Sequence, residues 1–116
     1  MLSKEQSIFF DTNGYIIVEN VISEDKTQKY LNLCLDHAEK IGNNDLTEML
    51  QVHKGVPETL EIMRSPKVVG IVEEILGGES HGLQSVCCFK KAGTPSAKYA
   101  WNPHQANSYM QAETGN

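Results

Sequence analysis

Apolar residues in the first part of the chain recur in short amphipathic stretches that are separated by turns. Ser3 and Gln6 form a capping-box pattern, which predicts a helix through Phe9 and Phe10. The stretch 11–14 predicts a turn, because its last residue is a glycine that readily takes a positive φ. The β-branched and aromatic run 15–18 then predicts a strand.

A longer helix with one apolar face is predicted to follow. Ser23 is a favourable N-cap, and the two acidic residues after it suit the positive end of a helix dipole. Gly42 is the expected C-terminal stop. Between them the apolar positions recur every three or four residues, at Tyr30, Leu31, Cys34, Leu35, Ala38 and Ile41.

Residues 42–56 have no clear period, and a short helix and a covering loop both stay open for them. Pro57 is suited to begin one further helical turn, and Ser65 followed by Pro66 is a favourable helix start. The apolar stripe of this last helix is formed by Val68, Ile71, Val72, Ile75 and Leu76, and Gly77-Gly78 is expected to end it.

The hydrophobic period changes to two near the end of the chain. Residues 83–90 predict a strand with Leu83, Ser85, Cys87 and Phe89 on one face and Gln84, Val86, Cys88 and Lys90 on the other. Residues 92–103 predict a loop, and His104–Met110 predicts the start of another strand. Helices first and strands last indicate an α+β fold. We interpret 1–116 as a single domain, helical over about residues 1–80 and β-rich over about residues 81–116.

The composition is that of a globular protein and argues against two classes of partner. Hydrophobic residues make up 40% and charged residues 22% of the chain, and the formal net charge is -5. Nucleic-acid binding needs clustered cations, and only Lys90 and Lys91 are adjacent. No run of apolar residues has the length of a membrane span.

Three cysteines, two of them neighbours, do not suit a disulfide framework, and they predict reduced core thiols in a cytoplasmic protein.

One segment carries the residue types that hold iron in a known class of enzymes. Asn102-Pro103-His104-Gln105-Ala106-Asn107-Ser108-Tyr109 resembles the Pro-Trp-His-Gln-Asp-x-x-Tyr-like motif of phytanoyl-CoA-dioxygenase-like proteins. Earlier segments resemble that family in the same order. They are the helix-turn-strand opening at 10–18, the helix start at 21–25, the helix 65–77 that ends in Leu-Gly, and the lysine-containing segment 89–93. The resemblance covers almost the whole chain.

The resemblance implies a fold, a chemistry and a set of site residues. The fold would be a double-stranded β-helix (jelly-roll) barrel whose first strands lie in this chain. The chemistry would be hydroxylation of a small-molecule or acyl substrate with Fe(II), 2-oxoglutarate and O2. His104 would be the first iron ligand. Lys90 would lie near a 2-oxoglutarate carboxylate, Gln84 would line the same pocket, and Tyr109 would sit beside the cleft.

Ala106 departs from the family, because it stands where the motif has an iron-binding aspartate. Alanine cannot coordinate a metal, and Gln105 is expected to point away from His104. In the family the second His and the 2-oxoglutarate-binding Arg come from later strands. We therefore expect an N-terminal portion with at most one of the three iron ligands. Three interpretations of Ala106 stay open: a halogenase with an iron position left for chloride, an inactive relative, and an engineered substitution.

Two hypotheses of other classes also stay open. One is a non-catalytic binding or interaction module that keeps the N-terminal half of the family, and the other is an unrelated small α+β domain. Two or three strands would leave an open sheet edge, which predicts dimerisation or strand pairing with another copy. Outside the motif, ordinary roles are expected: His53 and His81 are predicted to be solvated, and Trp101 to pack within its loop.

Overall fold

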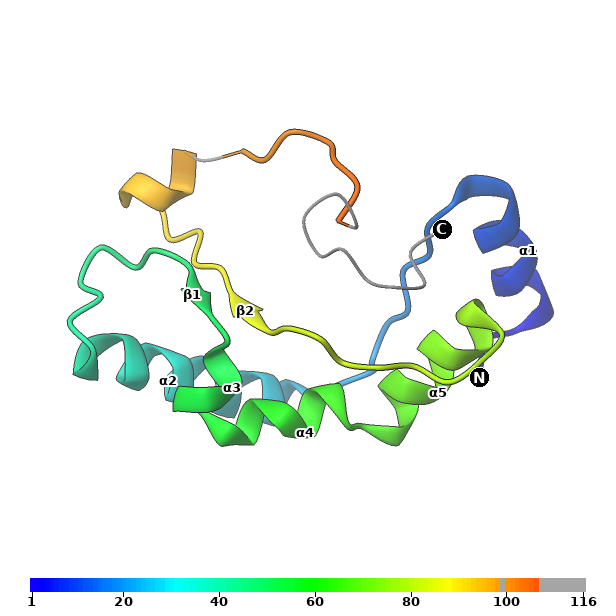
Figure 1. Ribbon diagram of the computed structural model, residues 1–116, viewed down its shortest axis with the longest axis horizontal. Helices are drawn as coiled ribbons and strands as arrows, with labels where there is room; N and C mark the ends of the chain where they lie inside the picture. The colour runs from blue at the N-terminus through cyan, green and yellow to red at the C-terminus, as the bar shows by residue number, and fades with distance from the viewer. Residues whose placement is uncertain (99, 107–116) are drawn as a thin grey trace.

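The first helix begins at the predicted cap and runs further than the sequence indicated. The computed structural model describes residues 1–98 and 100–106, and α1 spans Lys4–Asn13 (Figure 1). The side chain of Ser3 accepts from the amide of Gln6, and the side chain of Gln6 accepts from the amide of Ser3, so the capping box is formed. Gly14 ends the helix at φ 77°. The turn predicted for 11–14 is therefore correct only at the glycine.

The strand predicted for 15–18 is wrong, because this segment pairs with no strand in the described part of the chain. Tyr15 instead packs edge-on against Phe9, with 5.4 Å between ring centroids. Ile17 stays exposed. A β-branched run has a high strand propensity, but that propensity depends on a neighbouring strand and a surface to pack on.

The long helix α2, Glu24–Lys40, follows its sequence signals at both ends. The hydroxyl of Ser23 accepts from the amide of Lys26 at 3.4 Å. At the other end Gly42 takes φ 73°. Its amide donates to the carbonyl of Glu39 at 3.0 Å, and the amide of Asn43 donates to that of Ala38 at 2.8 Å. This pair of bonds is a Schellman motif, and it confirms Gly42 as the stop.

The stretch after α2 contains both a helical turn and a strand, and the strand was not predicted. β1 is Met49–Leu50 and α3 is Val52–Gly55. The turn expected at Pro57 is present as η1, Pro57–Thr59, and continues as α4, Leu60–Met63. The last helix, α5, is Pro66–Leu76, and Gly77 ends it at φ 69°, as predicted.

The sheet consists of two short strands in the described part of the chain. β2, Val86–Cys87, pairs antiparallel with β1, with Met49 opposite Cys87 and Leu50 opposite Val86. The strand expected over 83–90 is shorter than predicted because β1 offers only two residues to pair with. A 3-10 turn, η2, spans Pro95–Lys98 inside the predicted loop. Residues 104–106 form no strand, and the rest of the strand predicted for 104–110 lies outside the described residues.

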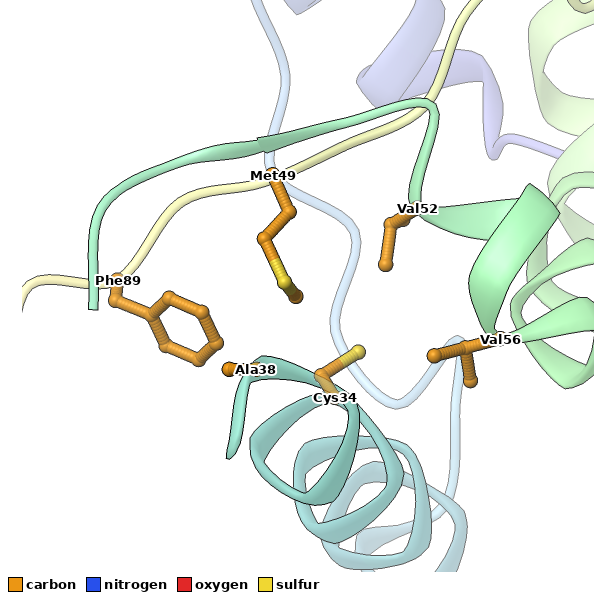
Figure 2. Packing of buried hydrophobic residues seen from close by; sticks show 6 residues of the cluster. All are labelled: Cys34, Ala38, Met49, Val52, Val56 and Phe89. Carbon is orange, nitrogen blue, oxygen red and sulfur yellow. The ribbon is translucent and has the colours of Figure 1, made fainter. Parts of the chain in front are cut away.

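The core lies between α2 and one face of this sheet (Figure 2). Side chains from α2, β1, α3, the residue after α3 and the end of the 83–90 segment point toward one another there; they are Cys34, Ala38, Met49, Val52, Val56 and Phe89. Burial alternates from Ser85 to Lys90, as predicted: Ser85 and Cys87 are half-buried, Phe89 is buried, and the residues between them are exposed. Leu83 is an exception, because it precedes β2 and is 69% exposed. The α+β class is thus confirmed as helices with one small antiparallel sheet.

Four of the helices lie along one side of the molecule. α2, α3, α4 and α5 follow one another along one side, while the segment after β2 runs along the other (Figure 1). The radius of gyration is 16.2 Å, whereas about 13 Å is typical of a compact domain of this length. None of the helices in the described ranges has the length and apolar character needed to cross a membrane.

Candidate functional site

The face of the sheet that points away from α2 holds the first candidate site residues. Gln84 and Lys90 are exposed, and alternation along the segment is expected to direct them away from the face of Cys87 and Phe89. Lys90 extends to the segment after η2, where its Nζ lies 4.5 Å from the centre of the Trp101 ring. This cation–π contact fixes the end of the 83–90 segment beside the segment that contains His104. Two sequence-predicted regions, around Lys90 and before His104, are therefore neighbours.

Trp101 was predicted to pack within its loop, but its side chain is 57% exposed. Its ring is covered on one face by Lys90 instead. The signal for this contact is present in the sequence, as a lysine at a strand end and one tryptophan on the following loop. Neither residue alone predicts the pairing, since the loop between them determines whether the two side chains meet.

His104 and Ala106 lie in an exposed segment without regular structure. Nδ1 of His104 is 2.8 Å from the carbonyl oxygen of Asn102, a contact in which a protonated Nδ1 donates. Ala106 is in a turn and exposed, and it offers no metal-binding atom. Tyr109, the last residue predicted for the site, lies outside the described residues.

The iron site of the oxygenases that the sequence resembles needs two histidines and a carboxylate on one face, and the described residues do not provide such a set. Among 1–98 and 100–106, no three His, Cys, Asp or Glu side chains converge closely enough to hold a metal ion. His104 is therefore not part of a three-ligand group within the described ranges. The described residues by themselves do not fit the iron centre that the resemblance implies.

His53 takes part in a contact that the sequence did not indicate. Its backbone amide donates to the hydroxyl of Ser85 at 3.2 Å, and its Nδ1 lies 2.5 Å from the same oxygen. Both residues are half-buried, so the prediction that His53 is solvated is wrong, whereas His81 is exposed as predicted. The contact joins the start of α3 to the segment before β2, next to the bond between the Gln51 amide and the Ser85 carbonyl at 2.6 Å.

The three cysteines are free thiols in three different environments. Cys34 is buried in the core, and Cys87 is half-buried against it. Burial, together with the neighbouring Cys34, raises the pKa of the Cys87 thiol to about 12. Cys88 is exposed, so the prediction of three core thiols is wrong at this position. Alternation along the strand explains the difference, because neighbouring side chains point to opposite faces.

Comparison of the chain with protein-family models, with curated proteins and with solved structures finds no match. Functional assignment therefore depends on the residues and their placement.

Proposed function

We propose that this chain is the N-terminal portion of a phytanoyl-CoA-dioxygenase-like oxygenase, and that the face of the sheet opposite α2 belongs to its 2-oxoglutarate pocket. The observation that carries the proposal is the contact between Lys90 and Trp101 at 4.5 Å. It brings the strand residue assigned to the cofactor next to the segment that holds the iron-ligand candidate. A jelly-roll barrel, completed by further strands, would enclose this face, and Fe(II) with 2-oxoglutarate would supply the oxidative chemistry.

The layering of the chain supports this assignment. A barrel sheet has one face packed on other elements and one face toward the pocket. Here α2 covers the face of Cys87 and Phe89. Gln84 and Lys90 lie on the other face, where an amide and an ammonium group are suited to bind a dicarboxylate. The free thiols favour a reducing compartment, and we place the protein in the cytoplasm.

The cofactor role of Lys90 is tested through Trp101, because it is the single tryptophan of the chain. A 2-oxoglutarate carboxylate that binds Lys90 changes the charge above the indole ring, so titration with 2-oxoglutarate should give a saturable change in fluorescence. Lys90→Met should abolish the change, and Lys98→Met, the matched control, should retain it. A response that sodium chloride reproduces at equal ionic strength would contradict the proposal.

The metal role of His104 is tested separately with Mn(II) as a paramagnetic probe. In NMR spectra Mn(II) should broaden the signals around His104 more than those around His81, which is also exposed. His104→Ala should remove the selective broadening, whereas His81→Ala should leave it unchanged. Equal broadening at the two histidines would count against a ligand role for His104.

Ala106, in place of the family's aspartate, supports two alternative functions for a relative of the same family. A small residue at this position leaves an iron coordination site for chloride, which is the arrangement of a halogenase. The absence of a donor also suits a non-catalytic interaction module derived from the family. Ala106→Asp separates the interaction module from the two iron-binding alternatives, the halogenase and a hydroxylase that lost its ligand. Tighter Mn(II) binding by this variant favours the iron-binding alternatives, and unchanged binding favours the interaction module.

A further inference from the structure

The outer edge of β2 presents backbone groups that β1 does not use. The amide of Gln51 donates to the carbonyl of Ser85, so the backbone of Ser85 faces β1. Backbone groups alternate in direction along a strand. Those of Gln84, Val86 and Cys88 therefore point to the opposite side. The sheet contains only β1 and β2 in the described part of the chain, and this row of donors and acceptors forms its edge.

The segment around this edge lacks the features that prevent strand pairing. Residues 82–89 contain no charged residue and no proline. Natural sheet edges are usually protected by charges, prolines, bulges or a covering helix. The outer face is also apolar at its centre: Leu50 is 63% exposed and Val86 is 41% exposed, and the two are opposite each other in the sheet. Short uncharged segments rich in β-formers pair readily with copies of themselves.

We propose that, in the 116-residue chain by itself, this edge pairs with the same edge of a second copy, antiparallel and centred on Val86. In this register the outward backbone groups of all three residues can form hydrogen bonds with the other copy. Gln84 lies opposite Cys88 of the other copy, Val86 opposite its equivalent, and Cys88 opposite Gln84. The result is a four-stranded sheet about a twofold axis, an isologous arrangement in which each copy uses the same surface.

Charge favours the antiparallel direction over the parallel one. The uncharged segment is preceded by Glu79 and followed by Lys90 and Lys91. Parallel pairing in register would place each lysine beside its equivalent, and like charges directly opposite are destabilising. In the antiparallel register Lys91 lies opposite His81 of the other copy, diagonal to Glu79. The acidic end of one segment thus meets the basic end of the other.

The central position provides a direct test, in the full chain and with EDTA present so that metal binding plays no part. Val86→Lys places two ammonium groups opposite each other and should weaken dimerisation in sedimentation equilibrium by about tenfold or more. Val86→Glu should do the same. An equimolar mixture of the two variants should restore the dimer, because opposite charges then meet. Leu76→Lys, an exposed apolar position on α5, is the matched control and should leave dimerisation unchanged.

The register is tested by cysteine pairing, which does not depend on the stability of a charged variant. Gln84→Cys places a thiol opposite the native Cys88 of the other copy and should give a covalent dimer under mild oxidation. Gln84→Cys combined with Cys88→Ser should give markedly less of it. A wild-type chain that stays monomeric at millimolar concentration would overturn the proposal. So would a dimer that Val86→Lys and Val86→Glu leave intact.

Discussion

The hydroxyl of Tyr30 donates a hydrogen bond to Oε2 of Glu61 at 2.8 Å, and this bond joins α2 to α4. The ring of Tyr30 is buried, whereas Glu61 is exposed. The hydrogen bond to Glu61 raises the pKa of Tyr30, and burial and the negative charge of Glu61 act in the same direction. The contact matters for the fold because α2 contributes Cys34 and Ala38 to the core. It holds α4, which leads into α5, against this helix.

Removal of this hydroxyl should lower stability in a pH-dependent way. Tyr30→Phe keeps the ring and loses the bond, so its thermal midpoint should fall at neutral pH. Since the folded-state pKa is raised above the ordinary 10.0, the bond contributes fully below pH 10 and is lost as pH rises through the folded-state value. The two midpoints should therefore converge at high pH. Tyr15→Phe, at an exposed ring, should show no such convergence.

The alternation along the 83–90 segment predicts very different costs for two similar truncations. Phe89 is buried against Ala38 and Met49, so Phe89→Ala should lower the free energy of unfolding by about 3 kcal/mol. Leu83 is exposed, and Leu83→Ala should cost about 0.5 kcal/mol or less. Urea unfolding at low protein concentration measures both values. A similar cost at the two positions would mean that the segment is not oriented as described.

The ends of the helices could be predicted from sequence because their signals are local. Ser3 with Gln6, and Ser23, satisfy the first free amides of their helices through their own side chains. Gly42 and Gly77 take positive φ, which costs glycine least. Each of these features depends on residues a few positions apart, so a single sequence contains the whole argument.

The sheet and the candidate site could not be predicted in the same way, since they depend on distant contacts. Residues 15–18 have better strand composition than Met49–Leu50, yet only the latter pair with β2. The orientation of Cys88 followed from alternation once β2 was placed, but the contact of Lys90 with Trp101 depends on the path of the intervening loop. The sequence indicated both faces correctly from Ser85 to Lys90 but not at Leu83, and it did not show which residues each face contacts.

Gly55 lies against the ring of His37, and this contact predicts a non-additive pair of substitutions. A Cβ on residue 55 would collide with the imidazole, so Gly55→Ala must displace His37 from its place beside α3. Because the His37 ring is half-buried and has room to move, we expect a loss of about 1 kcal/mol in the free energy of unfolding, the low end for an added methyl group. His37→Ala opens the space, so the double variant should be less destabilised than the sum of the two single variants.

Gly70 is the control for this experiment because it lies inside α5 with no neighbour that a Cβ would meet. Gly70→Ala should raise the free energy of unfolding by about 0.5–1 kcal/mol, since alanine loses less backbone entropy in a helix. Opposite signs for the two Gly→Ala changes would assign the effect of Gly55→Ala to the His37 ring. Strict additivity in the double variant would contradict the contact.

The three thiols should react with iodoacetamide in a fixed order, because the thiolate is the reactive species and must be reachable. Cys88 is exposed and should be alkylated first, in a phase that Cys88→Ser removes. Cys87 should react slowly in the folded chain, because its raised pKa of about 12 leaves almost no thiolate at neutral pH.

The alkylation rate of Cys87 in the folded chain should keep rising with pH above 9.0, the ordinary thiol pKa, whereas the rate in the unfolded chain should level off near that pH. The raised pKa of Cys87 also affects the free energy of unfolding. Its stabilising contribution is fully present below pH 9, where the thiol is protonated in both the folded and the unfolded chain, and it declines as pH rises toward the folded-state pKa. Mass spectrometry of peptides after short labelling identifies each site, and equal rates at Cys87 and Cys88 would contradict the opposite orientation of these neighbours.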